Sequence, residues 1–175
     1  PRPTGRGAVV RRLLVRGRAR LAPERCARLW QGRDMDDVSV RNATAADVDA
    51  LLELWSRAGE NGSRPDDRPD LVHALIEHDR EAVLLAELDG RVVATIIGGW
   101  DGWRANLYRL AVDPACRGRG LGRRMLELAE ERLRRLGAER FCAMVLDGNE
   151  EGQGLWQACG YAPQDDWSRW VKQAH

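Results

Sequence analysis

The feature that most constrains this sequence is a glycine-rich loop that separates an apolar stretch from a long amphipathic one. The apolar stretch ends at Val112, because the Pro114 that follows has no amide hydrogen to donate to a sheet. Glycines then occupy alternate positions in Arg117-Gly-Arg-Gly-Leu-Gly122. Where a strand turns through glycines into a helix, unpartnered amides of the first helical turn point toward any anion that binds. The sequence therefore predicts a phosphate-binding turn, with positive charge supplied by Arg117, Arg119, Arg123 and Arg124.

The spacing within this loop excludes two common nucleotide-binding signatures. A P-loop ends in Gly-Lys followed by Ser or Thr, and no such sequence occurs here. A dinucleotide-binding loop read from Gly118 would need its third glycine at the position of Arg123. The pattern that is present is Arg-x-x-Gly-x-Gly, formed by Arg117, Gly120 and Gly122. Taken alone, the loop is also compatible with a strand-to-helix turn that binds no ligand.

The net charge of +1 conceals an uneven distribution. Residues 1–34 contain ten arginines against Glu24 and Asp34, so acidic residues outnumber basic ones from Met35 onward. Such a body lacks the positive excess that binding to nucleic acid requires. The four cysteines show no C-x-x-C pairing, which predicts free thiols in a reducing cytoplasm. No run of eighteen apolar residues is present, so the sequence predicts no membrane span.

The charge distribution also predicts two regions. Residues 1–34 are expected to form a basic, disordered N-terminal extension, because their short apolar runs cannot build a core. This segment is compatible with upstream sequence from a misplaced start, with a basic arm, or with a transit peptide. The folded domain is expected over residues 38–173.

Hydrophobic periodicity predicts alternating strands and helices within that domain. Two β-rich runs, 82–88 and 91–97, flank Asp89-Gly90, which is the strongest short-range hairpin signal. A strand over 38–42 and helices over 44–58 and 69–79 precede this hairpin. The expected elements after it are a strand over 105–112, a helix over 121–136, a strand over 140–146, a helix over 149–159 and a last hairpin over 161–172.

This order of elements resembles the GNAT superfamily of N-acetyltransferases over residues 38–173. Arg-x-x-Gly-x-Gly resembles the acetyl-CoA pyrophosphate loop of that family. The stretches 89–95, 98–104 and 108–114, and the spacing from Asn149 to Gly160-Tyr161, resemble the small bacterial YpeA-like acetyltransferases. The resemblance implies an α/β domain with a mixed, mostly antiparallel seven-stranded sheet and helices on both faces.

The resemblance implies that acetyl-CoA is the cosubstrate. Backbone groups of Leu110, Ala111 and Val112 would pair with the pantetheine arm like an added strand, where a bulge splays the fourth and fifth strands. The Leu110 amide would polarise the acetyl carbonyl, and Asn149 would contact pantetheine through its own amide. The pyrophosphate would be held by the loop residues Arg117, Gly118, Arg119, Gly120, Leu121, Gly122 and Arg123.

The catalytic side chains are less constrained. Many family members place a tyrosine, the general acid for the leaving thiolate, four residues before the Gly-Tyr/Phe pair, and this chain has Trp156 there. Indole donates a hydrogen bond but does not release its proton near neutral pH. The thiolate could leave unaided, Tyr108 or Tyr161 could replace the acid, or Trp156 could serve packing alone. Glu87, Asp101 and Tyr108 are candidate bases by residue type and rough location.

The predicted function is transfer of an acetyl group from acetyl-CoA to a primary amine, by direct attack in a ternary complex. The alternative is a catalytically weak or inactive acyl-CoA-binding module, which the missing tyrosine favours. The expected acceptor is a small molecule or a peptide, with no nucleic-acid or membrane partner and no metal, and a homodimer is allowed. A nucleotide-phosphate enzyme is disfavoured, because the loop lacks the Lys-Ser/Thr pair and the chain lacks metal-binding carboxylates.

Overall fold

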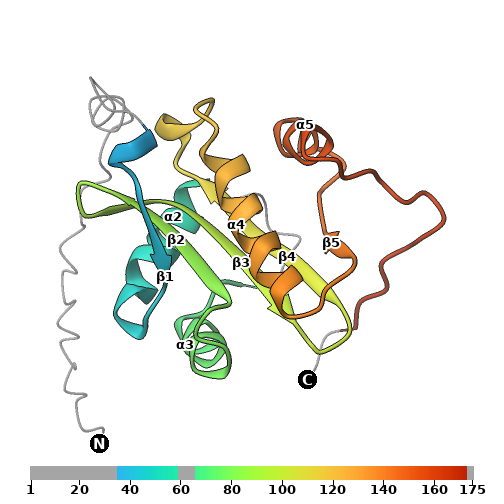
Figure 1. Ribbon diagram of the computed structural model, residues 1–175, viewed down its shortest axis with the longest axis horizontal. Helices are drawn as coiled ribbons and strands as arrows, with labels where there is room; N and C mark the ends of the chain where they lie inside the picture. Colours follow the sequence, from blue (N-terminus) through green and yellow to red (C-terminus); the bar gives the residue numbers. More distant parts are fainter. Residues whose placement is uncertain (1–34, 59–65, 173–175) are drawn as a thin grey trace, which may run out of the picture.

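The computed structural model describes residues 35–58 and 66–172, which form one sheet with helices on both of its faces (Figure 1). The expected N-terminal extension, the end of the first helix at Gly59 and the domain limit at Gln173 lie outside the described residues. The strands are β1 (Ser39–Asn42), β2 (Val83–Leu88), β3 (Arg91–Trp100), β4 (Ala105–Val112) and β5 (Phe141–Ala143). The helices are α2 (Val48–Ala58), α3 (Pro69–His78), α4 (Leu121–Arg135) and α5 (Glu150–Ala158), with short 3-10 turns η1 (Met35–Asp37), η2 (Ala45–Asp47) and η3 (Pro114–Cys116).

The strands follow one another across the sheet in the order β1-β2-β3-β4-β5. The first four are antiparallel, and the expected Asp89-Gly90 turn joins β2 to β3 with positive φ at both residues. β5 runs parallel to β4, which it reaches only after the α4 crossover. This arrangement confirms the expected mixed, mostly antiparallel sheet.

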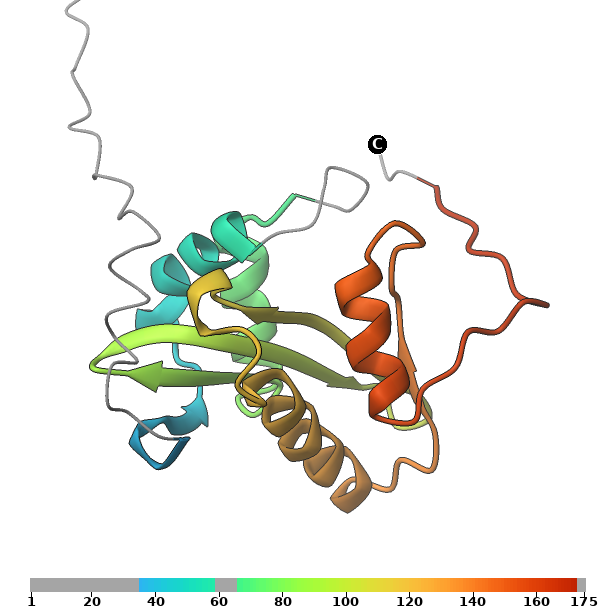
Figure 2. The same cartoon turned by 90° about the horizontal axis from the view of Figure 1, so that it is seen from above.

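The expected count of seven strands was wrong, because the described residues form five. The last hairpin, predicted over 161–172, is absent, and that segment runs away from the sheet after α5 (Figures 1 and 2). Trp167 and Trp170 stay 67% and 93% exposed, so the segment buries little apolar surface that could offset the entropy of ordering two strands. Pro163 also removes one ladder donor. The strand predicted over 140–146 is shortened to β5, because its pairing with β4 stops at Ala143, opposite Leu107.

The two faces of the sheet carry separate cores. α2 and α3 cover one face and α4 covers the other (Figure 2). The apolar stripe of α4 includes Met125, Leu126 and Leu133, each at most 1% exposed. Polar contacts also hold this helix on the sheet. The buried guanidinium of Arg132 donates to the Gly98 carbonyl (2.9 Å) and to the Asp79 carboxylate (2.7 Å). α4 is therefore held against the sheet near its C-terminal end, while its N-terminal end faces the glycine-rich loop.

A three-residue ionic network joins β1, β2 and η2. The Arg41 guanidinium donates two hydrogen bonds to Asp47 (2.7 and 2.8 Å) and two to Glu87 (2.9 and 3.0 Å). Asp47 also accepts from the Thr44 amide (2.8 Å), completing a capping box at the turn that leads into α2.

Replacing Asp47 with Asn should lower the Tm at pH 7, and the Tm difference from the original chain should be smaller in acid. Hydrogen bonds from Arg41 hold the pKa of Asp47 well below its usual range. The ionised carboxylate therefore stabilises the folded state above its unfolded pKa, near 3.8, and this stabilisation is lost as the pH falls further. Thermal unfolding should give a constant Tm difference from pH 8 to pH 5 that shrinks below about pH 4. The exposed Asp166→Asn is the control, and a difference independent of pH would contradict the argument.

Candidate functional site

β4 contains a bulge at its centre. Thr95 pairs with Ala111 and Ile97 pairs with Tyr108, so one residue of β3 lies opposite two residues of β4. Arg109, the first of those two, has a φ of 52°, a conformation that non-glycine residues rarely adopt. The bulge places the side chains of Tyr108 and Arg109 on the same face of the sheet, and Leu110 then packs toward the α4 core.

Beyond the bulge, β4 has one unpaired edge among the described residues. β5 pairs only with Ala105–Leu107, and the chain then leaves the sheet. On the other edge, the Asp113 amide donates to the Val93 carbonyl (2.8 Å). Because backbone groups alternate between the two edges of a strand, those of Ala111 face β3, whereas those of Leu110 and Val112 face the open edge. The unpaired edge therefore presents backbone donors and acceptors two residues apart.

The glycine-rich loop joins this edge to α4. Gly118 and Gly120 have φ values of 72° and 82°, and a Cβ at either would meet no atom within 4 Å. Gly120 is the N-cap of α4, and the first backbone bond of the helix runs from the Arg124 amide to the Gly120 carbonyl (3.0 Å). The amides of Leu121, Gly122 and Arg123 therefore have no helical acceptor. The backbone at this turn is open to a ligand and carries the positive end of the helix dipole.

α5 lies alongside the loop. The Arg117 guanidinium donates to the Glu151 carboxylate of α5 (2.6 Å) and to the Val112 carbonyl (3.2 Å), which lies on the open edge. A Cβ on Gly122 would lie 3.0 Å from the Leu155 Cδ2 atom of α5. Gly122, which lies inside α4 and has no positive φ, thus permits a close approach between the two helices.

Asn149 caps α5 at the end nearest the loop. Its Oδ1 atom accepts from the Gly152 amide (2.8 Å), and a Cβ on Gly152 would lie 2.3 Å from the Asn149 Nδ2 atom. Gln153 adds hydrogen bonds to the carbonyls of Leu146 (3.1 Å) and Asp147 (2.8 Å). The side chain of Asn149 is therefore folded over the first turn of its own helix.

The candidate catalytic side chains do not gather at one point. Tyr108 is 40% exposed beside the bulge, and burial raises the pKa of its phenol. Trp156 is 9% exposed in the α4-side core, where its ring packs edge-on against Tyr161 with centroids 4.8 Å apart. Glu87 lies on β2, two strands from β4, with both carboxylate oxygens bound by Arg41. Only Tyr108 adjoins the bulge itself.

Two residues beside the bulge carry no signal that sequence reasoning could use. Thr95 lies within an apolar strand and Trp55 within the apolar face of a helix, and both are buried. The Trp55 indole nitrogen donates to the Thr95 hydroxyl (2.8 Å), which donates to the Arg109 carbonyl (3.1 Å). Their role appears only once the register of β3 and β4 is known.

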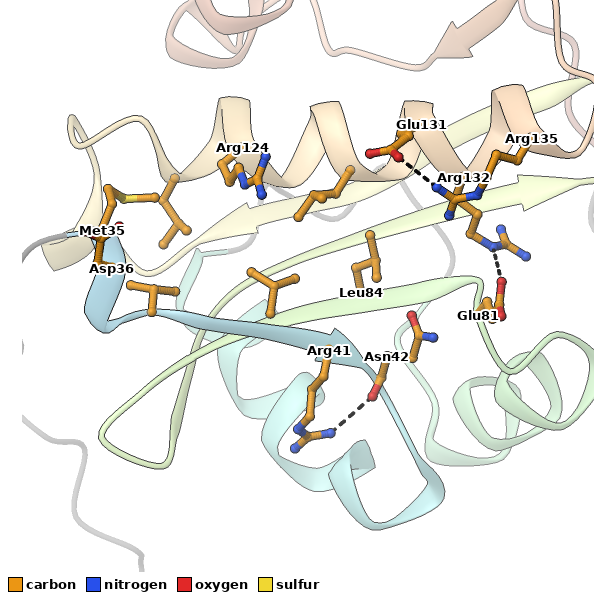
Figure 3. Close-up of a pocket in the computed structure, with 14 residues that line it drawn as sticks. Met35, Asp36, Arg41, Asn42, Glu81, Leu84, Arg124, Glu131, Arg132 and Arg135 are labelled. Carbon is orange, nitrogen blue, oxygen red and sulfur yellow. Dashed lines mark hydrogen bonds and ion pairs between the residues drawn. The ribbon is translucent and has the colours of Figure 1, made fainter.

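A broad groove of about 810 Å³ lies away from the open edge, between α4 and strands β1 and β2 (Figure 3). Apolar side chains such as Val40 and Leu84 line it, and Arg124, Arg132 and Arg135 border it along α4. Its lining includes none of the residues of β4, β5 or α5. The bulged edge and the groove are therefore separate features.

The open edge and the loop suit one kind of ligand. Such a ligand has an extended chain bearing amide groups, which pairs with the edge, and an anionic group at one end, which the α4 amides bind. Within residues 35–58 and 66–172, no three metal-ligating side chains cluster, and no helix is both long and apolar enough to cross a bilayer.

Comparison with known proteins identifies relatives of this arrangement. The sequence profile described as the acetyltransferase (GNAT) family matches residues 48–161. Acetyltransferase ECA0875 of Pectobacterium atrosepticum is 31% identical over 120 residues, which are 68% of this chain and 84% of that protein.

Two solved structures share the fold. The putative acetyltransferase yncA from Salmonella typhimurium, with its cofactor acetyl-CoA, has a TM-score of 0.61 and 25% identity, covering 72% of this chain and 80% of that one. Ard1 from Thermoplasma volcanium has a TM-score of 0.64 and 17% identity, covering 72% and 83%.

The cap of α5 generates a test with a matched control. Gly152→Ala forces a Cβ against the Asn149 side chain and should break the cap, lowering stability by about 1 kcal/mol and hence the Tm. Gly154→Ala, in the same helix, meets no atom within 4 Å and should raise stability by about 0.5–1 kcal/mol. Thermal unfolding of the two variants measures both effects, and equal shifts would show that the cap contributes nothing.

Proposed function

The chain belongs to the acetyltransferase (GNAT) family, and we propose that it transfers an acetyl group from acetyl-CoA to a primary amine in a ternary complex. The proposal rests chiefly on one observation. A bulged strand with an unpaired edge leads directly into a glycine-rich helix N-terminus. Those two features match the two halves of acetyl-CoA, an amide-bearing pantetheine arm and a pyrophosphate.

In the proposed complex, pantetheine pairs with β4 as an additional strand. Its amides bond to backbone groups of Leu110 and Val112. Ala111, which lies between them on the strand, keeps its pairing with Thr95. The pyrophosphate takes the amides of residues 117–123, with charge from the arginines of the loop. Asn149 lies at the start of α5, and its backbone amide donates to the Leu146 carbonyl (3.0 Å), so a contact between that amide and pantetheine would replace this hydrogen bond.

The reaction follows from that placement. The neutral amine attacks the thioester carbonyl carbon, and the carbonyl oxygen gains negative charge that the Leu110 amide stabilises. The C–S bond then breaks, its electron pair goes to sulfur, and the amide product forms. One proton passes overall from the amine nitrogen to the thiolate. Holding both reactants together supplies much of the rate enhancement.

Tyr108 is the side chain that we propose as the proton donor to sulfur. It lies beside the bulge, and its raised pKa keeps the phenol protonated throughout the neutral range. Trp156 occupies the position of the family tyrosine and is proposed to orient α5 by packing on Tyr161. Glu87 is not used as the base, because Arg41 binds both of its oxygens. A water molecule is the proposed acceptor of the amine proton.

The proposal extends to three finer points. The sequence motifs favour membership of the YpeA-like branch, and the cysteine pattern favours action in the cytoplasm. The proposed acceptor is a small-molecule or peptide amine. The competing function is an acyl-CoA-binding module with little or no activity, favoured by tryptophan at position 156.

Thiol release separates these two functions. The chain is incubated with acetyl-CoA and a panel of amines that covers polyamines, amino acids and peptide N-termini, and free CoA is measured. Release above the amine-free rate supports the transferase. Binding of CoA by calorimetry without amine-dependent release identifies the binding module, and absence of both overturns the proposal.

Gly120→Asp tests the pyrophosphate site. It places a negative charge at the N-cap of α4, where the pyrophosphate is proposed to bind, so CoA affinity should fall at least tenfold, or about 1.4 kcal/mol. Gly120→Asn is the matched control, because asparagine has nearly the same shape and tolerates the left-handed backbone as well as aspartate does. Calorimetry should give a much smaller loss for Asn, and equal losses would assign the effect to the backbone alone.

Tyr108→Phe tests the proton donor. Removal of the hydroxyl should lower kcat by about tenfold or more and leave CoA affinity unchanged. Tyr161→Phe provides the comparison, since the Tyr161 hydroxyl donates instead to Glu130 (2.7 Å) and its loss should not slow turnover. Steady-state rates with one good amine decide the matter, and an unaffected kcat in Tyr108→Phe would exclude this role.

A further inference from the structure

A buried relay of two hydrogen bonds ends on the bulge. The Trp55 Nε1 atom lies 2.8 Å from the Thr95 Oγ1 atom, which lies 3.1 Å from the Arg109 carbonyl oxygen. An indole N–H can only donate, so the threonine oxygen must accept from it. The single hydroxyl proton of Thr95 is then available for the Arg109 carbonyl. The direction of both hydrogen bonds is therefore fixed by the groups themselves.

The two relay side chains lie within an otherwise apolar core. Trp55 is 2% exposed and Thr95 is fully buried, and both pack in the core between α2 and the sheet. Valine would fit the Thr95 position with nearly the same volume, but it would leave a buried indole N–H without an acceptor. Thr95 also lies opposite Ala111, the first regular pair after the bulge.

The planarity of the peptide carries this constraint to the next residue. In a trans peptide the carbonyl of one residue and the amide of the next point in opposite directions. Because Thr95 holds the Arg109 carbonyl on the β3 side, the Leu110 amide must point to the other edge of β4. That edge is the one left open beyond β5.

The side chain of Arg109 is held by the same surroundings. Its guanidinium lies 5.6 Å from the centre of the Trp55 ring and forms an ion pair with Asp67. Trp55 therefore supports the bulge twice, through its ring under the arginine and through its nitrogen on Thr95. Both contacts favour the left-handed conformation of Arg109 that a residue with a Cβ otherwise avoids.

We propose that Thr95 and Trp55 are positioning residues for catalysis, which aim the Leu110 amide at the thioester carbonyl by fixing the peptide between Arg109 and Leu110. The inference rests on the proposed function, since it assigns how this chain prepares its oxyanion donor. Thr95 and Trp55 touch neither substrate, and they act through the backbone alone.

The test compares Thr95→Val, Thr95→Ser and the double variant Thr95→Val/Trp55→Phe. Thr95→Val removes the hydrogen bond to the carbonyl, and kcat should fall tenfold or more, because loss of one oxyanion donor has effects of about 10²–10³. Thr95→Ser keeps the hydroxyl and should stay within about threefold of the original rate. The double variant leaves no unsatisfied indole N–H, but it also loses ring volume in the core and the contact with Arg109, so its kcat should stay as low as that of Thr95→Val.

A spectroscopic reading separates positioning from general loss of structure. Infrared difference spectra of acetyl-CoA labelled with ¹³C at the thioester carbonyl report the polarisation of that bond in the bound state. The stretch should move to lower wavenumber on binding to the original chain and to Thr95→Ser, and less on binding to the two valine-containing variants. Affinity for CoA should be similar in all four proteins.

The outcomes distinguish this inference from the proposed function. A chain that binds no acetyl-CoA overturns both. A chain that binds it and shifts the carbonyl stretch, but acetylates no amine, overturns the transferase function and leaves the positioning role supported by the spectra. An unchanged kcat and an unchanged carbonyl shift in Thr95→Val, with binding intact, overturn the inference alone. Recovery of kcat in the double variant also overturns it.

Discussion

The buried carboxylate of Asp113 determines where β4 ends and where the glycine-rich loop begins. It is 3% exposed, and it accepts hydrogen bonds from Arg57 of α2 (3.3 Å), Arg91 of β3 (3.2 Å) and the Ala115 amide of η3 (3.1 Å). A charge at this depth is tolerated only when partners of opposite charge replace water. Removal of Asp113 would leave two arginines without their shared acceptor and the turn without its cap. The position of the loop relative to the bulge therefore depends on an ionic contact shared by three elements.

The parts of the fold that local chemistry dictates could be predicted from the sequence. Asp89-Gly90 takes the two left-handed conformations that a tight hairpin needs, and Gly118 and Gly120 take positive φ where α4 begins. The apolar stripe of α4 is buried as its spacing predicts. In each case one or two neighbouring residues fix the backbone, so no distant partner is required. The glycine-rich turn that leads into α4 was predictable for the same reason.

The parts that depend on distant partners could not be predicted. The bulge sits on Arg109, whose residue type gives no sign of a positive φ, and it is held by Thr95 and Trp55, which are 14 and 54 positions away in the sequence. The predicted hairpin over 161–172 has turn residues and aromatic residues in suitable places. Tyr161 packs on Trp156 of α5, but Trp167 and Trp170 stay exposed and pack against no second strand. A strand-like pattern indicates that a segment is able to join a sheet. Whether it pairs depends on the partner strand and apolar surface that the rest of the chain provides.

The open edge of β4 has a consequence for the origin of binding strength. The Val112 carbonyl on this edge already accepts from Arg117 (3.2 Å), and backbone groups with no protein partner bind water, so a ligand amide that pairs with the edge exchanges one hydrogen bond for another with a small net gain. Those groups are spaced by the strand itself and cannot adjust to a ligand of a different length. The edge therefore contributes more to selecting the length of a ligand than to its binding affinity. In the proposed complex the length of the edge sets the distance between the anion site at α4 and the Leu110 amide, so only a ligand whose reactive group lies at that distance would meet this amide.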